Sequence, residues 1–177
     1  MSGLWYDAIA MAGKDRGTGK KGAKPDGSKT VGRNRKAFFN YEVLEQVECG
    51  LALTGTEVKS LRDGQLNFGD GFARFRDGEL FLLNVNIAEY KQGGYSNHDP
   101  MRPRKLLLKK KELEKLQRAT EEKGTTLIPL SVYFNAKGIA KLALGLCRGK
   151  RLYDKRKAIA ERDSKRQLAH AKKELSR

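Results

Sequence analysis

Apolar and polar residues alternate along residues 41–54, YEVLEQVECGLALT. The odd positions are mostly apolar and the even positions mostly polar or small, with Leu44 and Glu45 as the exceptions. Because successive side chains of a strand point to opposite faces, this alternation predicts one long strand with a buried odd face and a wet even face. Gly50 lies within the run, where a missing Cβ permits a bulge or a tight bend.

The segments that follow predict further strands and two helices. Thr56 is expected to cap a short helix over residues 57–62, and residues 109–123 predict a longer helix that ends at Gly124. Asp77-Gly78 separates two apolar-rich runs and predicts a tight β-hairpin turn. Apolar residues of one parity predict two closing strands around a turn at residues 135–138; they are Ile128, Leu130, Val132 and Phe134, then Ala140, Leu142, Leu144 and Leu146.

This pattern predicts a mainly β fold. We expect a small closed antiparallel β-barrel, similar to the oligonucleotide-binding fold, with one short and one medium α-helix. The parity of the strands places Glu48 and Lys141 on outward faces, opposite the apolar side chains. Residues 89–103 are rich in Gly, Asn and Pro and are expected to form a long loop, in which the lone His98 is exposed.

Charge divides the chain into three parts. Residues 1–36 carry nine Lys and Arg against three Asp and Glu, and residues 148–177 carry twelve against four, whereas residues 37–147 carry sixteen against fourteen. We therefore expect a flexible basic extension at 1–33, a folded β-barrel domain at 34–147 and a basic tail at 148–177. Most of the net charge of +16 lies in the two ends, which would attract polyanions.

The tail is rich in helix formers but has too few apolar residues for a packing face. A helix that is polar all round is unstable alone, so we expect the tail to be disordered when free and helical when bound to RNA. Cys49 and Cys147 lie in apolar runs, which is typical of buried, reduced thiols in a cytoplasmic protein. No apolar run is long enough to span a bilayer.

Other functional classes find little support in the sequence. Two cysteines and two histidines at scattered positions give no metal-ligand spacing, so we expect no metal or other cofactor. No nucleophile–base arrangement or carboxylate pair is evident, which argues against an enzyme. A nuclease built on the barrel fold stays open, as does a general ribosome-associated RNA-binding protein or RNA chaperone held by charge alone.

Several segments, in order along the chain, resemble the bacterial SsrA-binding protein family, also called small protein B. The matching segments are NRKAFFNY (34–41), ECGLALTGTEVKSLRDG (48–64), DPMRPRKLLL (99–108), the strand pair around Lys141 and RGKRLYDKR (148–156). The resemblance implies a noncatalytic RNA-binding adaptor: a monomer whose domain at 34–147 binds the tRNA-like end of transfer-messenger RNA and which carries that RNA to stalled ribosomes for trans-translation.

The same resemblance implies roles for particular residues. The family's RNA-contact positions correspond to Asn34, Glu48, Leu107 and Lys141. The tail positions associated with the decoding centre and messenger channel of the ribosome correspond to Tyr153, Asp154, Lys155 and Arg156. The outward orientation of Lys141 and Glu48 agrees with a contact to RNA, although an ordinary surface residue would also face outward. Tyr153 lies among basic residues, where its ring would either stack on an unpaired base or pack against the barrel.

Overall fold

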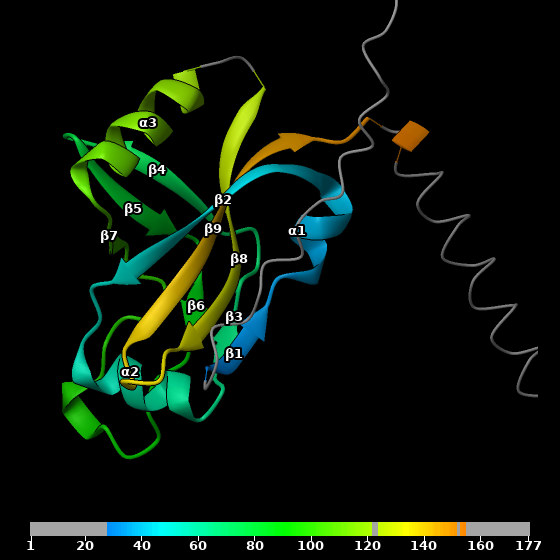
Figure 1. Cartoon of the computed structure of the whole chain (residues 1–177). Coiled ribbons are helices and arrows are strands. Elements are labelled where there is room, and N and C mark those ends of the chain that lie inside the picture. Colours follow the sequence, from blue (N-terminus) through cyan, green and yellow to red (C-terminus); the bar gives the residue numbers. More distant parts are fainter. Residues whose placement is uncertain (1–27, 122–123, 152, 155–177) are drawn as a thin grey trace, which may run out of the picture.

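The computed structural model describes residues 28–121, 124–151 and 153–154 (Figure 1). Three α-helices are described there: α1 (Arg35–Asn40), α2 (Gly55–Arg62) and α3 (Lys110–Glu121). A 3-10 turn, η1, covers Gly94–Ser96. The strands of the same part are β1 (Lys29–Arg33), β2 (Tyr41–Leu51), β3 (Leu66–Asn67), β4 (Phe72–Arg76), β5 (Glu79–Leu83), β6 (Asn86–Ile87), β7 (Arg104–Leu107), β8 (Thr125–Phe134) and β9 (Ala140–Gly149). The prediction of a mainly β fold is confirmed.

Seven strands form one antiparallel sheet in the order β1-β8-β4-β5-β7-β2-β9. Strand β8 also pairs with β9, so the pairings lead from β8 through β4, β5, β7, β2 and β9 back to β8. Strand β1 is added to β8, while β3 and β6 pair separately. Figure 1 shows the long strands β2, β8 and β9 crossing at the centre of the molecule, with α1 and α3 on different sides of them.

The long strand predicted at the start of the domain is confirmed as β2, but its odd residues do not share one face. The pairing with β9 shifts between Val43, which opposes Cys147, and Glu45, which opposes Leu146. Leu44 is the extra residue of this bulge and is 45% exposed. Because each bulge inserts one residue, the parity of the strand changes there. The expectation of a single buried odd face was therefore wrong for the first part of β2.

Strand β8 contains a second register shift, between Pro129 and Ser131. As a result its apolar residues separate into two clusters instead of one. Val132 and Phe134 belong to the main core, whereas Ile128 and Leu130 belong to a smaller second cluster. The main core also takes Leu142 and Leu144 of β9 and Leu116 of α3; the second cluster comprises Ala37, Ile128, Leu130, Ala143 and Cys147, with Phe38, Tyr41, Val43, Phe72 and Tyr133 packed against it.

Helix α1 covers this second cluster and was not predicted from the sequence. It has only six residues and one buried side chain, Ala37, so it shows no apolar periodicity. The Asn34 side chain caps it, accepting a hydrogen bond from the Ala37 amide at 3.0 Å. Strand β1 precedes α1 and pairs with β8, so residues Lys29–Arg33, which lie before the boundary expected at Asn34, also contribute a strand.

The remaining elements follow the sequence prediction closely. Asp77 and Gly78 have φ values of 51° and 75°, as a tight hairpin with two left-handed residues requires, and they join β4 to β5. Helix α2 begins at Gly55 rather than at residue 57, because Thr54, not Thr56, is its N-cap residue. Helix α3 is confirmed over Lys110–Glu121 and buries Leu116 in the main core.

Candidate functional site

A row of four residues crosses four neighbouring strands. Tyr133 of β8 opposes Lys141 of β9, Lys141 opposes Gly50 of β2, and Gly50 opposes Leu107 of β7. Residues directly opposite one another in a sheet project to the same face. The side chains of Tyr133, Lys141 and Leu107 therefore share one face, and Gly50 leaves a gap between the last two.

Glu48 joins this row from β2, two residues before Gly50 and on the same face. The Tyr133 hydroxyl donates a hydrogen bond to its Oε2 atom. The Lys141 ammonium lies 3.2 Å from its Oε1 atom. The Glu48 side chain keeps 50% of its surface exposed and that of Lys141 keeps 27%, so both polar groups stay accessible while their geometry is fixed. Tyr133, Glu48 and Lys141 are called the polar triad below.

The contacts of the polar triad also fix its protonation. The hydrogen bond from Tyr133 lowers the pKa of Glu48, and Lys141 lowers it further, against a smaller opposing effect of burial. Burial and the neighbouring Glu48 carboxylate raise the pKa of Tyr133. At neutral pH Glu48 is therefore a charged acceptor and Tyr133 a neutral donor. Together they offer both hydrogen-bond polarities on one exposed surface.

Leu107 adds an apolar contact at the end of the row. It is 52% exposed, whereas its neighbour Leu106 is 3% exposed and belongs to the main core. The alternation of β7 thus turns Leu107 outward, although leucine in a run of three leucines is usually buried. A Cβ atom at Gly50 would lie 3.2 Å from Cβ of Leu107, so the gap beside Leu107 depends on glycine.

Asn34 lies apart from this row. Its Oδ1 atom caps α1, and its Nδ2 atom donates to the carbonyl oxygen of Pro129 at 3.0 Å. The residue is buried, with 7% of its surface exposed. The structure therefore brings together three of the four expected RNA-contact residues, and it places Asn34 where its side chain fastens α1 to β8.

The tail residues are described only at their start. Tyr153 is 76% exposed and Asp154 is exposed as well. Lys155 and Arg156 lie outside the described residues, as does the part of the tail expected to become helical on RNA. Tyr153 lies a few residues after the end of β9. Its phenol is exposed, and no core residue of the described chain covers it.

Tyr133 is the residue of the site that the sequence analysis did not single out. A signal for it was present in the turn at residues 135–138, where Gly138 has a φ of 73°. Counting outward from this turn pairs Phe134 with Ala140 and Tyr133 with Lys141, as the structure shows. An outward lysine opposite a tyrosine is thus readable from the hairpin, but the contact of both with Glu48 requires the pairing of β9 with β2.

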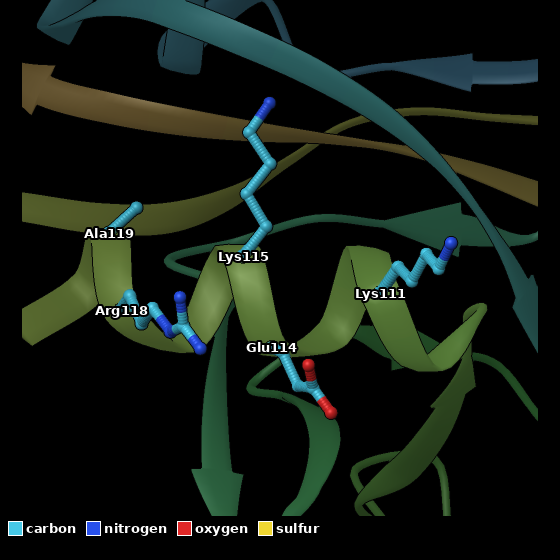
Figure 2. Close-up of a pocket in the computed structure, with 5 residues that line it drawn as sticks. All are labelled: Lys111, Glu114, Lys115, Arg118 and Ala119. Carbon is cyan, nitrogen blue, oxygen red and sulfur yellow. The ribbon is translucent and has the colours of Figure 1, made fainter.

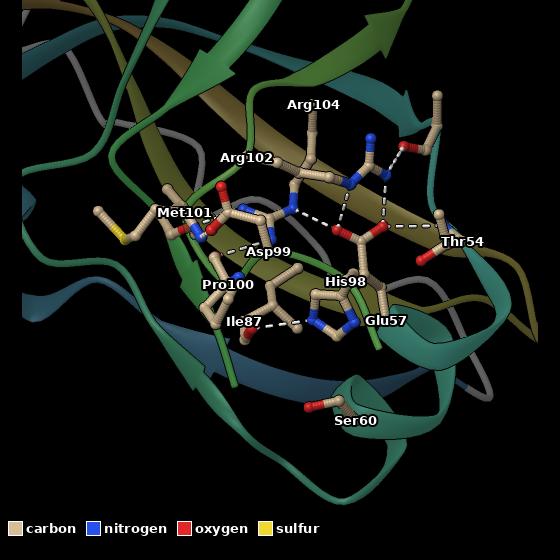
Figure 3. A network of polar contacts seen from close by, with 12 residues as sticks. Thr54, Glu57, Ser60, Ile87, His98, Asp99, Pro100, Met101, Arg102 and Arg104 are labelled. Atoms are coloured by element: carbon tan, nitrogen blue, oxygen red, sulfur yellow. Dashed lines mark hydrogen bonds and ion pairs between the residues drawn. The ribbon is translucent and has the colours of Figure 1, made fainter. Parts of the chain in front are cut away.

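A buried ionic network holds the strand that carries Leu107 (Figure 3). Glu57 of α2 is fully buried and receives hydrogen bonds from Arg102 at 2.9 Å and from Arg104 at 2.8 Å. It also accepts one from the Thr54 amide at 2.8 Å. Burial would raise the pKa of Glu57, but the donors of Arg102, Thr54 and Arg104 outweigh it and lower the pKa to about 2.

The same network reaches beyond α2. Arg104 is the first residue of β7, and its guanidinium also donates to the carbonyl oxygens of Val85 and Pro100. Arg102 donates to the carbonyl oxygen of Ala52, just after β2. These bonds join the end of β2, the start of β7 and the loop between β6 and β7. They set the position of β7 against β2, and with it the position of Leu107.

His98 corrects a second expectation from the sequence. It is buried, with 8% of its surface exposed, instead of lying free in its loop. Its Nδ1 atom lies 3.0 Å from the Thr56 hydroxyl, and its Nε2 atom lies 3.0 Å from the carbonyl oxygen of Ile87. The loop folds back onto α2 through these contacts and through the Glu57 network, which a sequence pattern does not reveal because the partners lie far along the chain.

One hollow of the described surface is lined mostly by charged side chains. This hollow (Figure 2) has a volume of about 380 Å³ and lies on α3; it is lined by Lys111, Glu114, Lys115, Arg118 and Ala119. Within the described ranges no three His, Cys, Asp or Glu side chains gather as they would around a metal ion. Among the helices described there, none is both long and apolar enough to cross a membrane.

The fold and the site define a class: a small, basic, mainly β protein that presents charged, polar and apolar groups on the open face of its strands. Residues 31–174 match the model of the family described as SmpB protein. The chain belongs to this family.

Two similar proteins are each named SsrA-binding protein. The one of Treponema denticola is 54% identical over 140 residues, which cover 79% of this chain and 90% of the relative. The one of Moorella thermoacetica is 52% identical over 146 residues, covering 82% and 94%. A solved chain from work named "tmRNA-SmpB: a journey to the center of the bacterial ribosome" is 55% identical, with a TM-score of 0.59, and the match covers 72% of this chain and 92% of the solved one.

Proposed function

We propose that this protein is an RNA-binding adaptor of trans-translation: it binds the tRNA-like end of transfer-messenger RNA and delivers it to stalled ribosomes. Membership of the SmpB family supports the class of function. The polar triad is the observation that supports the assignment of the RNA-contact site: Tyr133 and Lys141 hold the Glu48 carboxylate in a defined and exposed position beside Leu107.

The closed arrangement of the strands supports the site. The pairings of β8, β4, β5, β7, β2 and β9 return to β8 through β9, which supports our proposal of a small barrel of the oligonucleotide-binding kind. Glu48, Leu107 and Lys141 share a common face because β7 and β9 pair with the two edges of β2 in these registers. A barrel of this kind supplies a rigid platform for the site. In this proposal the adaptor acts as a monomer in the cytoplasm.

Each side chain of the face suits a different part of an RNA nucleotide. The Lys141 ammonium pairs with a phosphate oxygen. The Glu48 carboxylate accepts a hydrogen bond from a base amino group or from a ribose 2′-hydroxyl, a donor that DNA lacks. Leu107 packs against a base or sugar, and the bare backbone at Gly50 lets the RNA approach closely.

The tail addresses the ribosome in this proposal. Tyr153 stacks on an unpaired base near the decoding centre, and Asp154, Lys155 and Arg156 engage the messenger channel. The exposed position of Tyr153 beyond β9 supports such a role. The RNA-contact face and the tail then divide the function, since one selects the RNA and the other places it on the ribosome.

Sequencing the RNA that copurifies with the protein at moderate salt tests the first part. We expect strong enrichment of transfer-messenger RNA over ribosomal and transfer RNA, and its loss in the variant Glu48→Gln/Lys141→Gln. The alternative, a general RNA-binding protein or chaperone, is favoured by the net charge of +16. Bulk RNA that is released steeply with rising salt, without enrichment of any one RNA, would establish that alternative.

Removal of residues 154–177 tests the second part. The truncated protein is expected to keep its affinity for transfer-messenger RNA and to lose peptide tagging in a reconstituted translation system. A tail in which Tyr153, Asp154, Lys155 and Arg156 are replaced by alanine serves as the matched full-length variant. Undiminished tagging by either protein would remove the tail from the mechanism.

A further inference from the structure

The structure joins basic residues from the two ends of the domain around α1. Arg33, Arg35 and Lys36 come from the first described segment, and Lys150 and Arg151 come from the chain after β9. The Lys150 ammonium donates to the carbonyl oxygen of Phe38 at 3.0 Å, across 112 residues of sequence. These five residues are called the α1 cationic surface below.

The α1 cationic surface carries uncompensated charge. Its members are exposed except Lys150, which is partly buried, and none of them forms an ion pair within the part of the chain that the structure describes. Residues 28–41 contain no acidic residue. Glu42, the next acid, opposes Arg148 in the register and therefore faces away from Val43 and the second cluster on which α1 rests.

Local contacts hold two of these cations, Arg33 and Lys150, in place. The Arg33 guanidinium stacks over the Phe38 ring at 4.6 Å from its centre, while Lys150 binds the carbonyl oxygen of the same residue. Phe38 and Ala37 pack against the second cluster. The two hydrogen bonds of the buried Asn34 side chain fix α1 to β8. Arg33 and Lys150 therefore lose little freedom on meeting a ligand, while Arg35 and Lys36 project from a helix whose position is fixed.

The α1 cationic surface continues the face that carries the polar triad. Tyr133 packs against the second cluster beneath α1, and Glu48 opposes Ala143, a member of that cluster. Lys141 and Lys150 are nine residues apart along β9 and the chain directly after it, about 30 Å at the rise of a strand. An extended polyanion of about this length therefore reaches both Lys141 and the α1 cationic surface on the same side of the sheet.

We infer that the α1 cationic surface binds the phosphate backbone of the same RNA that the polar triad contacts. This rests on the proposed function for the identity of the RNA, but the surface itself follows from charge and position. It also gives Asn34 a role at the RNA site without direct contact: Asn34 is a positioning residue that seats α1.

The experiment measures RNA affinity against salt concentration for the full-length protein, with transfer-messenger RNA and with an unrelated structured RNA as probes. The variant Arg33→Gln/Arg35→Gln/Lys36→Gln removes three charges from the α1 cationic surface. The matched control, Lys110→Gln/Lys111→Gln/Arg118→Gln, removes three charges from α3, which packs on the main core on the other side of β2 and β9. Figure 2 shows Lys111 and Arg118 on α3.

Each lost phosphate contact lowers the slope of log affinity against log salt by about 0.7–0.9. We expect the α1 variant to lose about two units of slope with transfer-messenger RNA and the α3 variant to lose none. Equal losses in the two variants, or no loss in the α1 variant, would overturn the inference. The double variant Arg35→Gln/Lys36→Gln leaves the stacking of Arg33 on Phe38 intact and decides the matter if the triple variant does not fold.

The two proposals can fail separately. If the wild-type protein shows no preference for transfer-messenger RNA, the proposed function is wrong, whereas the difference between the α1 and α3 variants can still be measured on the unrelated RNA. If the preference is present and the two variants behave alike, the inference about the α1 cationic surface is wrong and the proposed function stands.

Discussion

The hydroxyl of Tyr133 donates a hydrogen bond to Oε2 of Glu48, although 85 residues separate them in the sequence. The contact depends on two hydrogen-bonded strand pairs, because β9 lies between β8 and β2. It leaves Oε1 of Glu48 to Lys141 and to a ligand. Tyr133 is therefore expected to affect RNA binding through Glu48.

The variant Tyr133→Phe tests this coupling. A single hydrogen bond contributes about 1 kcal/mol net, so we expect about fivefold weaker binding of transfer-messenger RNA. In the Glu48→Gln background the same change is expected to have little further effect, since the two residues act as a unit. Tyr90→Phe, which removes a hydroxyl bonded to Gln92, is the matched control and should bind normally. Equal losses from Tyr133→Phe in both backgrounds would show that Tyr133 acts without Glu48.

The loss of the Tyr133 hydroxyl also changes the response to acid. The hydrogen bond from Tyr133 is the largest effect that lowers the pKa of Glu48, so its removal raises that pKa toward the ordinary value of 4.5. As pH falls, Glu48 of the variant is then protonated earlier, at a higher pH than in the wild type. RNA affinity measured by fluorescence anisotropy from pH 7 to pH 4 should decline earlier in Tyr133→Phe. Coincident profiles would contradict the assignment.

Leu106 and Leu107 provide a test that separates folding from binding. Leu106 is in the main core, so Leu106→Ala should lower the free energy of unfolding by about 2–5 kcal/mol. Leu107 is 52% exposed, and Leu107→Ala should change stability by no more than about 0.5 kcal/mol. Urea unfolding measures both. Only Leu107→Ala is expected to weaken RNA binding at unchanged stability; full RNA affinity in this variant would exclude Leu107 from the contact.

The sequence predicted those features that depend on near neighbours. The alternation around Val47 and Cys49 identified β2, the pair Asp77-Gly78 identified its turn through two left-handed conformations, and the parity near Lys141 gave its outward direction correctly. Each of these depends on side-chain periodicity or on intrinsic backbone preference. Both are local properties that a single segment reveals.

The features that were missed depend on partners distant in the sequence. The bulge at Leu44 exists only in relation to β9, and it moved Val43 from the main core to the second cluster. His98 has the composition of a loop around it and is buried because Thr56 and Ile87 meet it. For Glu48, the outward direction was predicted, but the contact with Tyr133 that fixes its carboxylate requires the complete strand order.

Variants of Asn34 distinguish an indirect role of this residue at the RNA site from a direct contact with RNA. Asn34→Ala removes the cap of α1 and leaves the Pro129 carbonyl without its donor, which should cost about 1–3 kcal/mol of stability. Asn34→Ser keeps a cap acceptor for the Ala37 amide, so its loss of stability should be about half of the loss caused by Asn34→Ala. Urea unfolding and RNA affinity are measured for both. RNA affinity is expected to follow stability, with serine between asparagine and alanine; a serine variant that folds normally and binds as poorly as the alanine variant would indicate a direct amide contact with RNA.

Glu57 provides the last prediction, on the acid stability of the domain. The donors around it lower its pKa from 4.5 to about 2 in the folded protein, so its charge contributes stability that is fully present above pH 4.5 and is lost as pH falls toward 2. A shift of this size corresponds to about 3 kcal/mol at neutral pH. Glu57→Gln should lose at least about this much, because Arg104 remains buried without its counter-charge.

The same variant should unfold with a flatter dependence on pH between 4.5 and 2 than the wild type. Urea unfolding at intervals from pH 7 to pH 2.5 measures both effects. Glu79→Gln breaks the exposed pair with Lys105 and is the matched control, with an expected loss below about 1 kcal/mol. Because Glu57 anchors the start of β7, Glu57→Gln should also displace Leu107 and weaken RNA binding. If Glu57→Gln is as stable as the control and has the pH dependence of the wild type, the Glu57 network does not contribute to the stability of the domain.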